Sequence, residues 1–531
     1  MAHTRSGTPS RSGWSAALPG TRTGARVGGR VSAAVARRLA GGVPVTTAGR
    51  RARRPAASDR TVREVLELAV RCGEAMLSLG AAAADVVEAI RTTCAAWGVE
   101  VQVDVTFTAI LVAADGDDDA PGTSVLRVVQ VRASDYDRLG RVAAVVEDVA
   151  ARRPAGRPDD RPDDRPDDRP SDRPGDRSDP GAHERVLAEL EAAHARLDAV
   201  LTEPQRYRPA LVTASLAAMA AGVALLLGGG PLVVVLAAAT TGAVDVVLRW
   251  LGRWGLPAFF LQVAGAAVVT TVAVLLLEVV PGLPVELTAL PPSLVVGSGI
   301  VVLLAGMSMV GAADDAINGY PVTASGRLLE VLLLTLGLVV GIGGVLDLAR
   351  RAGTQLDLFD TGAAAWSLPV QVLGAALASA GWACSCFAGP RTAAVAAAAG
   401  GGAWLVHAAL TGAGLPTAVA GAVGALLVGA AAERTRRLTG VPVTVMTSCG
   451  IVPLLPGLAI YEGMLDLVTG SETGGRLMEA AVVGVGLAAG ATLGRTLAAR
   501  AGALRRRHPA PPQQTPRHAS EGRREGRALG L

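Results

Sequence analysis

The sequence of 531 residues contains no lysine, so its 50 basic side chains are all arginine. The formal net charge is only +4, which gives no reason to expect binding to nucleic acid. The five cysteines form no CxxC pair, so neither a zinc site nor another metal site is expected. We interpret them as reduced thiols that serve as small hydrophobic side chains.

Motifs of common hydrolases are missing as well. The chain has no HExxH and no GxSxG, and the carboxylates of Asp85, Glu88 and Asp104 come with no recognisable nucleophile and base. We therefore expect a protein that is not an enzyme and needs no cofactor. The alternative that stays open is a membrane-anchored hydrolase or an uncoupled channel, in which the N-terminal domain serves catalysis or regulation.

Apolar runs dominate the chain after residue 208, and 50% of all residues are hydrophobic. Ten of these runs are each long enough to cross the roughly 30 Å hydrocarbon core of a bilayer. The sequence therefore predicts a multi-pass α-helical membrane protein with about ten transmembrane helices. The expected spans are 209–228, 231–250, 257–280, 293–313, 328–349, 366–388, 391–410, 414–432, 441–461 and 476–498.

The segments outside the apolar runs differ in composition. Residues 1–57 hold eleven arginines without Asp or Glu, and no apolar run there is long enough for a signal peptide, so a disordered basic tail is expected. Residues 152–181 contain the repeat RPDDRPDDRPDDRP, which predicts a low-complexity linker. Residues 182–205 follow as an amphipathic connecting helix, and residues 501–531 as a second disordered tail.

Residues 58–151 predict a small N-terminal cytoplasmic α+β domain. Residues 61–97 have the apolar spacing of two helices, and residues 99–105 alternate between valine and polar side chains as in a half-buried strand. The other expected elements are strands at 106–113 and 123–132 and a helix from Asp135 to about Ala151, capped by Ser134. The expected element order is ααβββα.

Arginines in the short loops predict the orientation of the spans. One set of loops holds more arginine than the other, and the positive-inside rule assigns the richer set, together with both termini, to the cytoplasm of a plasma-membrane protein. The richer set is Arg249, Arg253, Arg327, Arg391, Arg434, Arg436 and Arg437, against Arg350, Arg351 and Arg476.

Prolines interrupt the ninth apolar run. A broken helix at membrane depth persists only where it is packed in protein or lines a wet cavity, because lipid cannot satisfy the freed backbone groups. Small and polar side chains flank this break, so we interpret it as part of a transport path; a kinked packing helix is the alternative. The substrate-path candidates are Thr444, Thr447, Ser448, Pro453, Pro456, Gly457 and Tyr461.

A related unit occurs earlier, at residues 306–330. There we expect a helix end, a loop with Asp314 and Asp315, and a new helix that opens with GRLLE at Gly326. The later unit opens its new helix with GRLME at Gly475. These strings begin the fifth and tenth spans, so each half contains five helices, and equivalent helices of the two halves cross the bilayer in opposite directions. The predicted halves of this 5+5 inverted repeat are 206–350 and 351–500.

Charged side chains inside the spans are costly to bury and are therefore candidates for proton coupling. The candidates are Asp245, Glu330 and Glu479. In the alternative, each forms an ion pair with a neighbouring arginine, namely Arg249, Arg327 and Arg476 respectively.

Several stretches resemble the bacterial threonine/serine exporter family. CGEAMLSLGAAAADVVEAI at 72–90, VDVTFTAILV at 103–112 and LRVVQVRASDYDRL at 126–139 are similar to its N-terminal cytoplasmic domain, and residues 306–330 and 450–467 are similar to its two membrane motifs. The resemblance implies secondary export of small neutral amino acids, threonine and serine, driven by the proton-motive force. The residues it highlights are Gly73, Gly80, Asp85, Arg127, Arg132 and Tyr136 in the N-terminal domain, and Pro453, Pro456 and Gly457 in the membrane.

The expected partners follow from this reading. They are small amino acids, protons and the lipid bilayer, with no nucleic acid. Assembly into a homo-oligomer is left open.

Overall fold

The structure is a computed structural model. It describes residues 59–114, 122–129, 133–151, 180–279, 297–300, 303, 306–353, 366–439, 442–457, 459–460, 462–463 and 475–507. The expected basic tail, most of the RPDD linker and the site candidates Arg132 and Tyr461 lie outside the described residues.

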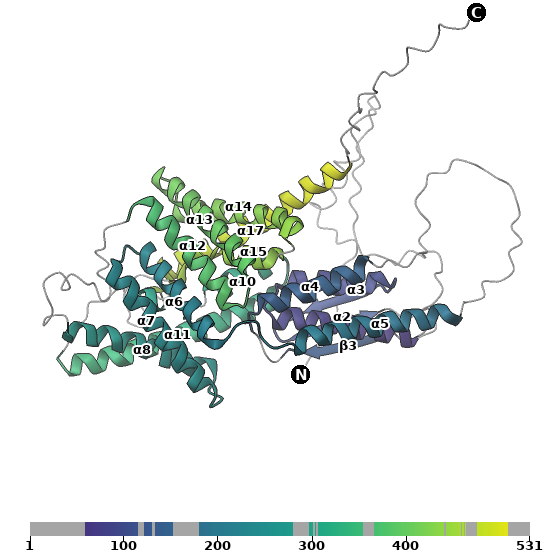
Figure 1. The fold of residues 1–531 in the computed structure, drawn as a ribbon, viewed down its shortest axis with the longest axis horizontal. Coiled ribbons are helices and arrows are strands. Elements are labelled where there is room, and N and C mark those ends of the chain that lie inside the picture. The colour runs from purple at the N-terminus through teal and green to yellow at the C-terminus, as the bar shows by residue number, and fades with distance from the viewer. Residues whose placement is uncertain are drawn as a thin grey trace, which may run out of the picture. The chain divides into compact units, whose positions relative to one another are not determined.

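The N-terminal region, residues 59–202, combines helices with one small sheet (Figure 1). Its sheet is antiparallel in the order β1-β2-β3, with Val103 opposite Val112 and Val112 opposite Val125. The order of two helices, three strands and a helix agrees with the order expected from the sequence. The elements are α2 (Asp59–Ser78), α3 (Ala83–Ala96), β1 (Val101–Val105), β2 (Ala109–Ala114), β3 (Thr123–Val128), α4 (Tyr136–Ala151) and α5 (Pro180–Thr202).

One hydrophobic core joins these elements. Leu66 and Leu77 of α2, Ile90 of α3 and Ile110 of β2 are fully buried. Helix α5 contributes buried leucines to the same core and packs on α2 and α4 (Figure 1). Each buried leucine stabilises this packing by about 1.5–3 kcal/mol. The amphipathic connecting helix therefore packs on the N-terminal region.

Eight helices of the described residues are long and apolar enough to cross a membrane. Large apolar side chains such as Leu275, Leu333 and Leu373 are exposed on them, as expected for surfaces that face lipid. The eight helices are α6 (Pro209–Leu226), α7 (Pro231–Gly252), α8 (Ala258–Val279), α11 (Pro321–Arg351), α12 (Leu368–Ser385), α13 (Pro390–Gly412), α14 (Thr417–Thr439) and α17 (Gly475–Arg507).

Two predicted spans take another form in the described residues. The fourth contains α10 (Gly306–Ile317), and the ninth contains α15 (Val443–Gly450), which is followed by the 3-10 helix η3 (Val452–Leu454). Pro453 lies within η3, and Leu455 then has an extended backbone, so the predicted break is present. The total of ten spans stays a prediction.

Three expected boundaries are wrong. Helix α11 begins at Pro321 and not at Gly326, because proline at the first helical position needs no amide partner. Asp314 and Asp315 lie in the last turn of α10 and not in a loop. Helix α17 continues to Arg507, past the expected end of the second half at residue 500.

Candidate functional site

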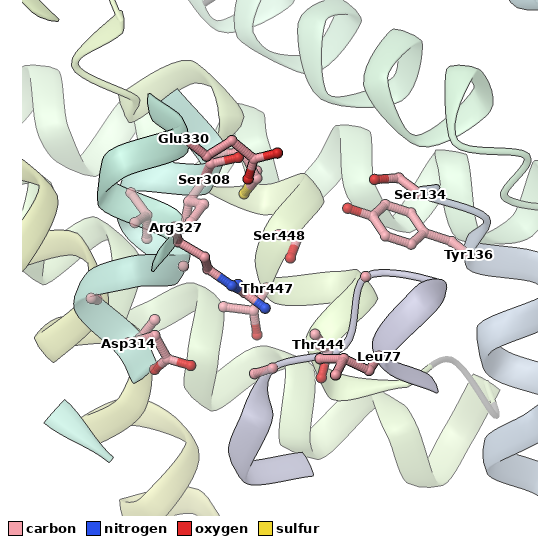
Figure 2. A pocket seen from close by; sticks show the side chains of 18 of the residues that line it. Leu77, Ser134, Tyr136, Ser308, Asp314, Arg327, Glu330, Thr444, Thr447 and Ser448 are labelled. Carbon is pink, nitrogen blue, oxygen red and sulfur yellow. The ribbon is translucent and has the colours of Figure 1, made fainter. Parts of the chain in front are cut away.

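A cavity of about 250 Å³ lies between the N-terminal region and four helices, α10, α11, α15 and α17 (Figure 2). Pockets for drug-sized ligands measure roughly 300–1,000 Å³, so this cavity suits a smaller solute. Helix α10 of the first half also packs against α17 of the second half. The cavity is therefore formed jointly by both halves of the helical region and by the N-terminal region.

Charged side chains of both signs line one side of the cavity. Arg327 Nε lies 3.1 Å from Asp315 Oδ2, and Asp315 is fully buried. The Arg327 guanidinium points into the cavity in Figure 2. Arg495 Nη2 lies 3.1 Å from Asp314 Oδ1, which also accepts a 2.5 Å hydrogen bond from Thr492 Oγ1. These pairs hold two guanidinium groups at the cavity.

Glu330 supplies a negative charge of a different kind. It lines the cavity one turn after Arg327 on α11, and its carboxylate points into the open space in Figure 2. It forms no ion pair within the described residues, where Arg327 pairs with Asp315 instead. Its carboxylate is therefore available for a bound cation or proton.

Hydroxyl groups form another part of the wall. Thr444, Thr447 and Ser448 follow one another at helical spacing along α15, so all three lie on the face toward the cavity. Thr447 Oγ1 donates to Val443 O at 2.8 Å. Thr444 Oγ1 donates to a carboxylate oxygen of Asp85. The structure thus brings together three of the predicted substrate-path residues.

The proline break supports this wall without lining it. Pro453, Pro456 and Gly457 are not among the lining residues. A Cβ at Gly306 would lie 3.4 Å from Leu455 Cβ and 3.8 Å from Gly457 Cα, so the break packs against the start of α10. The two related sequence units therefore meet at the cavity.

The N-terminal candidates have separate roles. Gly80 ends α2 with φ +98°, a conformation that favours glycine, and lines the cavity with Tyr136. Gly73 allows α2 and α3 to approach closely, because a Cβ there would lie 2.6 Å from Ile90 Cδ1. Arg127 forms exposed ion pairs with α2 and lies outside the cavity.

Asp85 stands at the edge of the cavity, in the first turn of α3. Burial raises the pKa of its carboxyl above the ordinary value of 3.8, whereas Arg495 and the Thr444 hydroxyl act in the opposite direction. Its surroundings therefore favour the protonated carboxyl more than water does.

The other two proton-coupling candidates lie away from the cavity. Asp245 accepts hydrogen bonds from Arg249 and, at 2.7 Å, from Thr213 Oγ1. Asp245 thus forms the ion pair with Arg249 that is the alternative to proton coupling. Glu479 is exposed on α17, and Arg476 pairs with Glu462 instead. Of the three candidates, the structure brings only Glu330 to the cavity.

Sequence reasoning missed five polar side chains of the site: Ser134, Ser308, Asp314, Arg327 and Arg495. The signal that could have found Asp314 and Arg327 is their charge within an otherwise apolar stretch. Arg495 gives no such signal, because it lies near the end of an expected span, where arginine is common.

Eight apolar helices of membrane-spanning length, together with a charged, polar cavity that two of them help to line, define this chain as a multi-pass membrane protein of the transport class. Comparison with known proteins identifies the family. A family model described as "Putative threonine/serine exporter" matches residues 67–155 and 183–349, and a second, described as "Threonine/Serine exporter, ThrE", matches residues 371–497. The chain belongs to the threonine/serine exporter family.

Two curated relatives are similar over most of the chain. A "Probable threonine/serine exporter" of Mycobacterium tuberculosis is 34% identical over 467 residues, which cover 86% of this chain and 80% of the relative. A "Threonine/serine exporter" of Corynebacterium glutamicum is 29% identical over 467 residues, which cover 86% of each protein. No solved structure matches the chain.

Proposed function

We propose that this protein is a secondary active exporter of threonine and serine across the plasma membrane, driven by the proton-motive force. The observation that carries the proposal is the cavity itself, in which guanidinium groups, the carboxylate of Glu330 and several hydroxyls face one small space. The names of the two curated relatives support the same substrates.

A zwitterionic amino acid fits this arrangement. In our proposal the Arg327 guanidinium donates to the substrate carboxylate, and Glu330 accepts from the substrate ammonium group. Charge-assisted hydrogen bonds of this kind are about twice as strong as neutral ones. The hydroxyls of α15 complete the polar surface around the solute.

Proton coupling then follows from competition for one carboxylate. A protonated Glu330 carries no charge and loses its attraction for an ammonium group, so proton and substrate occupy it in turn. One proton that moves down 100 mV supplies about 2.3 kcal/mol, which supports roughly a fifty-fold gradient of a neutral amino acid. Asp245 and Glu479, the other two candidates, do not line the cavity.

Alternating access is the proposed transport mode. The packing of the break near Gly457 against α10 supports a site at the interface of two halves, as in an inverted repeat. We place both termini, and with them the N-terminal region, in the cytoplasm, on the arginine distribution of the loops. The wall of the cavity that the N-terminal region supplies then lies on the cytoplasmic side.

The test is export of threonine and serine from preloaded cells, with and without an uncoupler. Export against a gradient that collapses with the uncoupler supports the proposal. Flux that follows the gradient and ignores the uncoupler would instead mean an uncoupled channel. No flux of either amino acid would overturn the choice of substrates.

A further inference from the structure

The N-terminal region supplies part of the cavity wall. Leu77, Gly80, Ala82, Ser134 and Tyr136 line the cavity, although none belongs to a membrane helix. In Figure 2 the hydroxyls of Ser134 and Tyr136 face the cavity from the side opposite Glu330 and Arg327. The charged groups and these two hydroxyls therefore lie at different ends of the same space.

Polar contacts fix this wall to the membrane helices. The buried carboxylate of Asp315 accepts a 3.1 Å hydrogen bond from the amide of Ala83, and Arg327 Nη2 donates to Ala81 O at 3.2 Å. The amide of Tyr136 itself donates to Cys386 O at 2.8 Å. Tyr136 is thus held in place by the backbone next to the cavity.

Phe107 adds an apolar contact on the same side. A Cβ at Gly326 would lie 2.6 Å from Phe107 Cγ, so the turn between β1 and β2 packs directly on α11. Nearby, Thr323 Oγ1 of α11 donates to Val105 O at 2.9 Å. The N-terminal region is therefore docked through several elements, and its cavity residues have a defined position.

Ser134 offers an unbonded hydroxyl to a ligand, whereas the Tyr136 phenol has Ser448 and Trp382 as hydrogen-bonding neighbours. Asp135, and not Ser134 as expected, caps α4, because Asp135 Oδ1 accepts from the amide of Arg138 at 3.1 Å. Ser134 is exposed and makes no hydrogen bond within the described residues. Burial raises the pKa of Tyr136 well above its ordinary value, so its phenol stays a protonated donor.

We propose that Ser134 and Tyr136 of the N-terminal region recognise the side-chain hydroxyl of the transported amino acid and set its preference over amino acids without that group. This inference rests on the proposed function. A substrate whose ammonium and carboxylate groups meet Glu330 and Arg327 directs its side chain toward the opposite wall, where the two hydroxyls lie. The N-terminal region is then part of the substrate site.

Threonine and valine make a sensitive comparison, because they have nearly the same shape and differ in one hydroxyl. A site built to bond a substrate hydroxyl rejects the analogue without it, since the polar groups of the site are left unpaired. Serine and alanine give the same comparison with a smaller side chain.

The experiment measures competition in proteoliposomes that contain the full chain. Unlabelled threonine, valine, serine and alanine compete with labelled threonine for transport by the parent, Ser134→Ala and Tyr136→Phe. Tyr207→Phe is the matched control, because Tyr207 donates to Ala388 O at 2.7 Å and does not line the cavity. Gel filtration in detergent verifies that each variant is folded.

We expect Ser134→Ala and Tyr136→Phe each to lower the preference for threonine over valine by about tenfold. In Tyr207→Phe, competition by all four amino acids should match the parent. Folded variants that keep the parent's preference, or that lose affinity for all four amino acids equally, would overturn the inference alone. A parent that carries neither threonine nor serine would overturn the proposed function, and with it this inference.

Discussion

The two related sequence units, GRLLE at 326–330 and GRLME at 475–479, have different positions in the structure. In the first, Gly326 lies inside α11 and packs against Phe107, Arg327 pairs with buried Asp315, and Glu330 lines the cavity. In the second, Gly475 begins α17, and Arg476 and Glu479 are exposed. Two nearly identical strings therefore differ in role: the charged side chains of the first line the cavity, and those of the second are exposed.

The largest expected effect is on stability, when the acidic partners of Arg327 and Arg476 are replaced. Asp315→Asn leaves the largely buried side chain of Arg327 without its counter-charge, and breaking a buried ion pair from one side costs about 3–5 kcal/mol. Glu462→Gln breaks the more exposed pair with Arg476 and should cost less than about 1 kcal/mol. Thermal unfolding of the purified proteins in detergent measures both. Equal shifts in the two variants would contradict the difference between the units.

The second prediction concerns the two glutamates. Glu330→Gln should lower threonine export by about 100-fold, the effect of losing a charge-assisted contact to the ammonium group. Glu479→Gln should transport like the parent, because its side chain lies away from the cavity. Initial export rates, corrected for the amount of protein in the membrane, decide the matter. A defect in Glu479→Gln as large as that in Glu330→Gln would mean that the two units act symmetrically.

Sequence reasoning predicted the architecture better than the site. The apolar runs predict the eight helices of spanning length among the described residues, and the alternating valines predict β1, because both patterns are local. The GRLLE string predicts a helix start at Gly326, but α11 begins at Pro321, whose proline is the stronger helix-start signal. The pairing of Arg327 with Asp315, and the approach of Ala83 to the same carboxylate, depend on contacts between distant segments that no local pattern encodes.

A third prediction asks whether both units face the solute. Ser308 of α10 and Ser448 of α15 both line the cavity. In a version without native cysteines, Ser308→Cys and Ser448→Cys should react with a membrane-impermeant thiol reagent, and threonine should slow each reaction by about tenfold at a concentration of ten times its Kd. Leu333→Cys on a lipid-facing surface is the inert control. Protection of one serine position alone would restrict the substrate path to a single unit.

The smallest expected effect is the pH dependence of stability that Asp85 causes. Asp85 of the N-terminal region contacts Thr444 of the second unit. Asp85 has a raised pKa in the folded protein, so the folded state binds its proton more tightly than the unfolded state does. The stabilisation from this proton is complete below the ordinary value of 3.8 and is lost as pH rises through the raised pKa. Asp85→Asn removes the titrating carboxyl and with it this loss of stability. The Tm of the variant minus the Tm of the parent should therefore increase as pH rises above 3.8. A Tm difference that stays constant with pH would contradict the assignment.

Proton-coupled exchange at Glu330 is the central claim, and the ratio of protons to threonine tests it most directly. Proteoliposomes with an imposed pH gradient and a trapped pH dye report both fluxes at once. The account predicts uphill threonine movement with about one proton moving in the opposite direction for each threonine. In Glu330→Gln, residual threonine flux should follow its own gradient and ignore the pH gradient. Uphill, proton-linked threonine transport that persists in Glu330→Gln would contradict the account.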